Sequence, residues 1–245
     1  LQPRTQLARE RVDLIGGAPN FDTNPSRFIS TALDAATDAG LGVDLHVDET
    51  LDPSSLDVLE LARQVQNRGF EHQVVASHCV SLGMQTPKVQ AEVAREISEA
   101  GIAVFPLPQT NLFLQGRDLS SATPRGLTAL RALQDAGVLV AAGADNVQDI
   151  YNQVGRSDPL ETAALLVMAG HQLADDAYRM VSNDAREGLG LARVELTPGA
   201  PADLLAINAV SPREAIADAP MSRRVYHLGE LVASADQWTQ VHRAD

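Results

Sequence analysis

The sequence is poor in cysteine, in positive charge and in long apolar segments. Cys79 is the only cysteine among 245 residues, so the chain can form neither an internal disulfide nor a site made of several thiolates. Any metal ion must therefore be bound by imidazole and carboxylate groups. The 32 Asp and Glu outnumber the 19 Lys and Arg, and the net charge of -13 disfavours nucleic acid and anionic membrane surfaces as partners.

Membrane insertion and secretion also lack support in the sequence. No apolar run approaches the roughly 18 residues that cross a bilayer, and residues 1–10 have neither the apolar core nor the cleavage site of a secretory signal. We therefore expect a cytoplasmic protein. With 44% hydrophobic and 21% charged residues, the composition is that of a globular protein with one large domain, or one domain plus an appendage.

Short apolar runs alternate with longer amphipathic segments, which is the pattern of βα units in a parallel sheet. The predicted strands lie at 12–17, 42–47, 73–78, 102–107 and 138–145. The predicted helices lie at 26–39, 54–68, 87–100, 124–136, 158–171 and 175–189. Two later segments, 197–209 and 223–234, are predicted as short strands of a small β appendage, with "HLGE" as a two-residue hairpin turn.

A spacing of about 30 residues between strands fits a doubly wound sheet and a (β/α)8 TIM-type barrel equally well. The Gly-rich turn of a nucleotide-binding sheet is missing after the first strand, where the sequence reads "GGAPNFD". Polar groups instead recur at the carboxyl ends of the predicted strands: His46 and Glu49, His78, Asp145 and Asn146. Because barrel enzymes carry their chemistry at this end, the pattern favours the barrel.

Side chains alternate along a strand, so His46 is predicted to point into the barrel. Glu49 would face the opposite way in a continuing strand. It can join His46 only if the strand ends near Val47 and the chain turns. Asp145 follows small residues of the same face, such as Ala141 and Gly143, which leave room for a ligand.

This arrangement of side chains suits hydrolysis assisted by a metal ion. His46 and Asp145 come from different strands and are predicted to bind one divalent ion, Zn²⁺ or Fe²⁺. His78 could then hold the attacking water, and Glu49 could move a proton between water and substrate, a role worth roughly 10²- to 10⁴-fold in rate.

Structural explanations compete with these roles. A single histidine at a strand end is more often a hydrogen-bonded structural residue, and Asp145 could equally cap the following turn. Asp44 and Asp48 are interpreted as structural, the first satisfied inside the barrel and the second orienting a neighbour. His171 ends a helix, where a cation favours the helix dipole.

Five motifs, in this order and spacing, resemble the bacterial cytosine deaminase branch of the amidohydrolase superfamily. They are "HVDE" (46–49), "ASHC" (76–79), "PLPQTNLFLQGR" (106–117), "GADN" (143–146) and "DPLETAALLVMAGHQL" (158–173). The resemblance extends to "PGAPADLLAINA", which is similar to a strand of the family's small β-sandwich. It implies a (β/α)8 barrel with one iron or zinc ion. Residues 1–196 would form a partial barrel with strands 4 to 8, and residues 197–245 part of the β-sandwich.

By this resemblance, His46 and Asp145 would be metal ligands, Glu49 the proton shuttle, and His78 the residue that positions or deprotonates the metal's water. Gln115 would help to shape the substrate pocket.

Two features depart from the family. The His-x-His pair of the first barrel strand is missing, so we expect strands 1 to 3 to lie outside this chain. Asn146 stands where cytosine deaminase has an aspartate that contacts the substrate. Because an amide both donates and accepts hydrogen bonds, the preferred ring can differ.

The leading hypothesis is hydrolytic deamination of a small nitrogen heterocycle. One alternative is hydrolysis of a cyclic amide or an N-alkyl amine on the same scaffold. Another, supported only by the missing His-x-His pair, is a metal-free binding protein derived from such an enzyme. A homo-oligomer is compatible with the sequence, which carries no specific interface signal.

Overall fold

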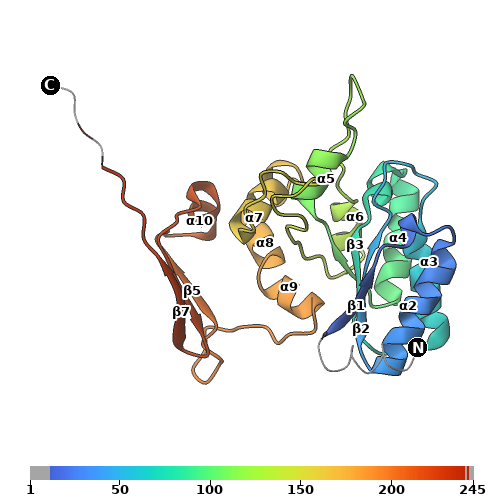
Figure 1. Ribbon diagram of the computed structural model, residues 1–245, viewed down its shortest axis with the longest axis horizontal. Coiled ribbons are helices and arrows are strands. Elements are labelled where there is room, and N and C mark those ends of the chain that lie inside the picture. Colours follow the sequence, from blue (N-terminus) through green and yellow to red (C-terminus); the bar gives the residue numbers. More distant parts are fainter. Residues whose placement is uncertain (1–11, 241, 243–245) are drawn as a thin grey trace.

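The central element of the protein is a parallel sheet of four strands in a computed structural model that describes residues 12–240 and 242 (Figure 1). The strands are β1 (Leu14–Gly17), β2 (Gly42–Val47), β3 (Val74–His78) and β4 (Ala103–Phe105), in the spatial order β1-β2-β3-β4. The register pairs Val43 with Val74 and Val75 with Ala103. The first four predicted strands are therefore confirmed, each within two residues at either end.

The fifth predicted strand, 138–145, is wrong for most of its length. Only Val140 forms a parallel bridge, to Val104, although Ala141 N–H also donates to the Val104 carbonyl at 3.1 Å. The next residue, Ala142, donates instead to the Met180 carbonyl, and Asp145 adopts a left-handed φ of 62°. Pro106 has no N–H and stands directly after β4, so the neighbouring strand is short as well. Within the described residues the sheet stays open and closes no barrel.

Three helices cover one face of this sheet (Figure 1): α2 (Pro25–Ala39), α3 (Asp57–Arg68) and α4 (Pro87–Glu99). Asn24 caps α2 by accepting the Arg27 N–H, and α2 and α3 end at glycines with φ of 68° and 57°. Each helix buries one apolar stripe against the strands, with side chains such as Ile29 and Leu61 fully buried. Burial of such a side chain contributes about 1.5–3 kcal/mol, which explains why the 3.6-residue periodicity located these helices.

The helices after β4 differ from the prediction. A helix that the sequence did not reveal, α5 (Pro108–Leu114), follows β4 directly, and α6 (Leu130–Asp135) covers only part of 124–136. Then come α7 (Pro159–Met168), α8 (Ala174–Met180) and α9 (Asn183–Gly188), the last two replacing the single helix expected at 175–189. The 3-10 helices η1 (Pro19–Phe21) and η2 (Val80–Met84) follow β1 and β3. None of the helices in the described part of the chain could span a membrane.

The C-terminal part is a small antiparallel sheet of β5 (Leu204–Ile207), β6 (Arg223–His227) and β7 (Glu230–Ala235), with α10 (Pro212–Asp218) between β5 and β6. His227 pairs with Glu230, and the two residues between them, Leu228 and Gly229, both have positive φ. This confirms the predicted hairpin turn at "HLGE". Helices α7 to α9 lie between this sheet and the parallel sheet (Figure 1).

Candidate metal centre

The turn after β2 delivers two side chains to one place. β2 ends at Val47, and Asp48 has a left-handed φ of 56°, so the chain turns where the sequence predicted that it must. The buried Asp48 carboxylate holds this turn: Oδ1 accepts the Asp57 N–H at 2.7 Å, and Oδ2 accepts the Val58 N–H at 3.1 Å, both at the start of α3. Glu49 is thereby directed to the same space as His46.

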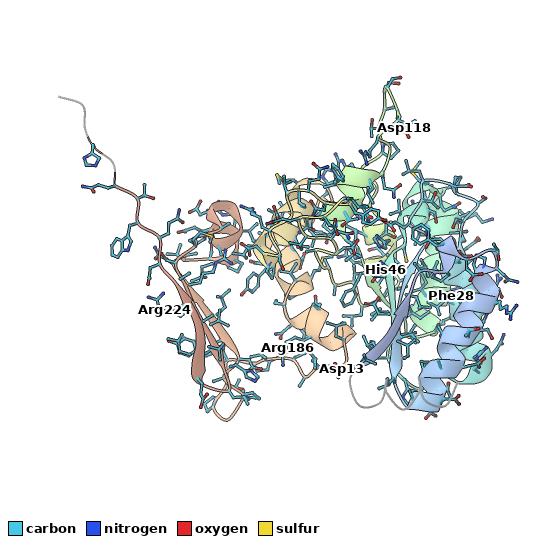
Figure 2. The ribbon with its side chains drawn as sticks, viewed as in Figure 1. Asp13, Phe28, His46, Asp118, Arg186 and Arg224 are labelled. Atoms are coloured by element: carbon cyan, nitrogen blue, oxygen red, sulfur yellow. The ribbon has the colours of Figure 1, made fainter. Side chains whose placement is uncertain are left out.

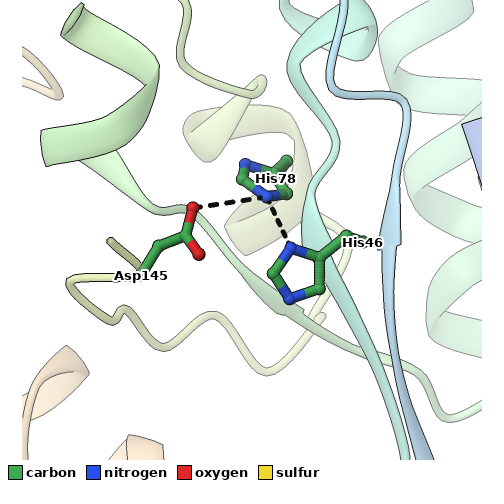
Figure 3. Close-up of side chains that lie close together, drawn as sticks. All are labelled: His46, His78 and Asp145. Atoms are coloured by element: carbon green, nitrogen blue, oxygen red, sulfur yellow. Dashed lines mark hydrogen bonds and ion pairs between the residues drawn. The ribbon is translucent and has the colours of Figure 1, made fainter. Parts of the chain in front are cut away.

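The four predicted catalytic and metal-binding side chains meet at the carboxyl ends of the strands, and Figure 3 shows three of them, His46, His78 and Asp145. His46 Nδ1 lies 2.8 Å from Nε2 of His78, which ends β3. The same Nε2 lies 3.7 Å from a carboxylate oxygen of Glu49 and 3.7 Å from one of Asp145. In the view of Figure 2, His46 lies below the loop that follows α5. This loop carries Asp118 near its tip.

His78 is fully buried, and its ring has a fixed partner on each side. Burial lowers the pKa of His78 to about 4, so the imidazole is neutral at pH 7. Asn111 of α5 lies 2.9 Å from Nδ1 through its Oδ1. Because a carbonyl oxygen can only accept, this contact favours the tautomer with the proton on Nδ1, in which the lone pair of Nε2 faces His46, Glu49 and Asp145.

These residues fit a divalent metal ion. His46, His78 and Asp145 each offer one ligand atom, and these atoms lie within 4.8 Å of one another. Zn²⁺ binds imidazole and carboxylate at about 2.0–2.2 Å, so donors on one ion lie roughly 3–4 Å apart. The sequence predicted His46 and Asp145 as ligands, which stays a prediction. The structure adds His78 Nε2 as a third possible donor.

The carboxylates of the site have raised pKa values. Burial, followed by the negative charge of Asp145, raises the pKa of Glu49 to about 7. Burial also raises the pKa of Asp145, against the lowering effects of His46 and of a hydrogen bond from Thr110. Glu49 can therefore take up and release a proton near neutral pH, which is what a proton shuttle requires.

A pocket of about 340 Å³ opens beside this cluster. Six of its lining residues are Asn20, His46, Glu49, Gln115, Asp145 and Tyr151. Gln115 Nε2 donates to the Glu49 carbonyl at 3.3 Å and lines the pocket, while its predicted role in shaping the substrate pocket stays a prediction.

Asn146 also lines the pocket, but other residues occupy its amide. Its Oδ1 accepts from the Thr110 hydroxyl at 3.3 Å, and its Nδ2 donates to Asp149 at 2.6 Å. The predicted contact between Asn146 and a substrate therefore stays a prediction, because in this conformation the amide holds the loop 146–152 together.

Two residues that the sequence interpreted as structural, Asp44 and His171, have partners in the structure. Asp44 accepts the Ser77 hydroxyl at 2.8 Å below the site. His171 is exposed and contacts Arg125, but it lies three residues beyond the end of α7 at Met168, so it does not end the helix as predicted. Sequence reasoning missed Asn111, Thr110, Asn20 and Tyr151. The only sequence signal for the first two is their place in "PLPQTN", directly after a predicted strand.

A sequence model described as the amidohydrolase family matches residues 1–237. A pterin deaminase from Rhizobium rhizogenes is 33% identical over 234 residues, covering 93% of this chain and 53% of that protein. The chain thus spans about half the length of this curated relative.

Solved structures are similar over almost the whole chain. A 5-methylcytosine deaminase from Klebsiella pneumoniae liganded with 5-fluorocytosine has 25% identity and a TM-score of 0.85, covering 97% of this chain and 60% of that chain. An N-isopropylammelide isopropylaminohydrolase from Burkholderia multivorans has 26% identity and a TM-score of 0.79, covering 94% of this chain and 57% of that chain.

Proposed function

The chain belongs to the amidohydrolase family, and we propose that the protein is a metal-dependent hydrolase that deaminates a small nitrogen heterocycle. One observation carries this proposal: His46, His78 and Asp145 converge within 4.8 Å, with the Glu49 carboxylate 3.7 Å from His78, beside an open pocket. The relatives named as deaminases of pterin and 5-methylcytosine support the reaction type.

The fold proposed for the whole protein is a (β/α)8 barrel, of which residues 1–196 would form strands 4 to 8. Residues 197–245 would form part of a β-sandwich. The order of β1 to β4 and the TM-score of 0.85 to the Klebsiella enzyme support this assignment.

The metal would be held by His46 and Asp145, with the Nε2 lone pair of His78 facing the same space. A bound Zn²⁺ or Fe²⁺ would act as a Lewis acid that lowers the pKa of water to roughly 7. By the resemblance, which we adopt as part of the proposal, His78 would position or deprotonate the metal's water, and we assign this role to Nε2. Because its pKa is about 4, His78 is neutral and can accept a hydrogen bond there at pH 7.

Glu49 would move the protons of the reaction. Water adds to the ring carbon that carries the amino group, the adjacent ring nitrogen gains a proton, and the amine leaves as ammonia after receiving another. A carboxyl group with a pKa of about 7 can give and regain a proton at each of these steps. Gln115 and Asn146 are proposed to contact the heterocycle from the pocket wall.

Two other functions remain alternatives. The Burkholderia relative is named for an N-alkyl amine, which favours hydrolysis of such a bond, or of a cyclic amide, as the second candidate. A metal-free binding protein is the third. We propose a small heterocycle as the binding partner and neither nucleic acid nor a membrane. The proposed location is the cytoplasm.

Product analysis separates these candidates. The intact protein, loaded with Zn²⁺ or Fe²⁺, is incubated with cytosine, 5-methylcytosine, isoguanine, pterin, creatinine and N-isopropylammelide. Ammonia release from an aminated ring supports the proposal, and isopropylamine release supports the second candidate. Absence of both products, together with no stoichiometric metal in the purified protein, would favour the binding protein.

A further inference from the structure

Three consecutive side chains at the start of α5 contact three separate parts of the molecule. Gln109 donates through Nε2 to the Thr162 hydroxyl of α7 at 2.6 Å. The Thr110 hydroxyl accepts the Asn146 N–H at 3.2 Å, next to Asp145. The third residue, Asn111, contacts His78 of β3. All three are at most 7% exposed, so this segment, residues 109–111, is a buried polar connection between α7, β3 and the loop that carries Asp145 and Asn146.

The contact between Asn111 and His78 decides where the imidazole carries its proton. Asn111 Oδ1 lies 2.9 Å from Nδ1 on one side of the ring. On the other side, Nε2 lies 2.8 Å from His46 Nδ1 and 3.7 Å from carboxylate oxygens of both Glu49 and Asp145. Both carboxylates would attract the proton to Nε2. The acceptor at Nδ1 is the opposing influence, because a neutral imidazole carries one proton and the better placed acceptor holds it.

The NH₂ group of the Asn111 amide, Nδ2, is buried and has no hydrogen-bond partner among the described residues. An unpaired buried donor is unfavourable, and a leucine would fill nearly the same volume without it. The carbonyl oxygen directed at His78 is therefore the part of this side chain that explains an amide at position 111.

We propose that Asn111 is a positioning residue that holds His78 in the Nδ1–H tautomer, so that the Nε2 lone pair is presented to the candidate metal centre. The use of that lone pair rests on the proposed function, whereas the tautomer does not. Without the Asn111 carbonyl, the proton would move to Nε2 and donate to His46 Nδ1, which lies 2.8 Å away. A proton on Nε2 would then block the position from which His78 can bind a metal or accept a hydrogen bond from water.

The test reads the tautomer directly. The intact protein is labelled with ¹⁵N-histidine, freed of metal with a chelator, and studied at pH 8 by long-range ¹H–¹⁵N correlation, with His78 assigned from the signals lost in His78→Gln. We expect Nδ1–H in the wild type and in Asn111→Asp, which keeps an acceptor oxygen. Asn111→Leu should move the proton to Nε2. Gln109→Leu is the matched control, because it removes an equally buried bond of the same segment and should leave the tautomer unchanged.

A wild-type His78 in the Nε2–H form, or an unchanged tautomer in Asn111→Leu, would overturn the proposal. The wild-type spectrum decides by itself should Asn111→Leu fail to fold. As a second readout, Zn²⁺ affinity should fall roughly 10- to 100-fold in Asn111→Leu and stay unchanged in Gln109→Leu. Equal affinities in these two variants would overturn the role at the metal centre. A protein that deaminates nothing but shows the expected tautomers would refute the proposed function and leave this inference standing.

Discussion

Nδ1 of His46 and Nε2 of His78 lie 2.8 Å apart, although the two residues are 32 positions apart in the sequence. Burial lowers the pKa of His78 to about 4, so its ring is neutral at pH 7, and in the tautomer that we propose its Nε2 offers a lone pair toward the other ring. A cation that binds both nitrogens would draw on this lone pair. The pairing makes metal binding the first property to test.

Metal binding should stabilise the protein through His46. A ligand that binds only the folded state adds about 2.7 kcal/mol when its free concentration is 100 times its Kd. Zn²⁺ should therefore raise the Tm of the intact wild-type protein in a thermal melt, and His46→Ala should lose most of this increase. His242→Ala, which removes an exposed histidine, is the control. An equal response of the His46 and His242 variants to Zn²⁺ would contradict the assignment.

The Glu49→Gln variant should lose turnover and keep its metal. The amide cannot exchange protons near pH 7, so the rate of ammonia release should fall by at least about 10²- to 10⁴-fold. Metal content, measured by atomic emission, should equal that of the wild type. Glu71→Gln changes an exposed carboxylate in the turn before β3 and should leave both quantities unchanged. Normal turnover in the Glu49 variant would refute its role as proton shuttle.

The turn at Asp48 should be sensitive to the kind of residue placed there. Alanine would leave the Asp57 and Val58 N–H groups without their carboxylate and would strain a φ of 56°, so we expect a loss of about 2–4 kcal/mol in the free energy of unfolding. Asparagine accepts a hydrogen bond and tolerates left-handed φ, so Asp48→Asn should cost clearly less. Urea unfolding of both variants measures the difference, and equal losses would argue against this explanation.

The small antiparallel sheet should be attached in a pH-dependent way by Asp158 and Arg223. Two hydrogen bonds join them, at 3.0 and 2.9 Å, and Asp158 also accepts the Leu160 N–H at the start of α7. Burial acts to raise the pKa of Asp158, but the bonds from Arg223 and Leu160 outweigh it, and the pKa is lowered. The pair therefore stabilises the folded state above the unfolded pKa of about 3.9, and this stability is lost as the pH falls through the lower folded value.

We expect Asp158→Asn to reduce the free energy of unfolding by about 1–3 kcal/mol at pH 7. This difference in unfolding free energy between the variant and the wild type should become smaller below about pH 4. Asp176→Asn is the control, because the Asp176 and Arg179 side chains are 36% and 59% exposed and such pairs contribute only about 0–1 kcal/mol. Denaturant unfolding at pH 7 and pH 3 measures both variants. A difference in unfolding free energy that grows as the pH falls would contradict the predicted pH dependence.

Much of the architecture could be predicted because it depends on neighbouring residues. The period-2 pattern of "GVDLHV" located β2 at both of its ends, and the Leu228 and Gly229 turn followed from two residues of hairpin chemistry. The end of β2 near Val47 followed from the need to bring His46 and Glu49 together. Helix α5 was missed although Pro108 stands in its first turn, where proline is common, and the strand at 138–145 was drawn too long.

The sequence by itself thus determined the alternation of strands and helices and the residue types that gather at the strand ends. The tertiary structure alone decided which nitrogen of His78 faces the site, because that depends on Asn111, 33 residues away. It likewise decided that Asp158 meets Arg223, 65 residues away. Periodicity and turn chemistry act between adjacent residues, whereas a tautomer, a shifted pKa or an ion pair is set by whichever side chains packing brings together.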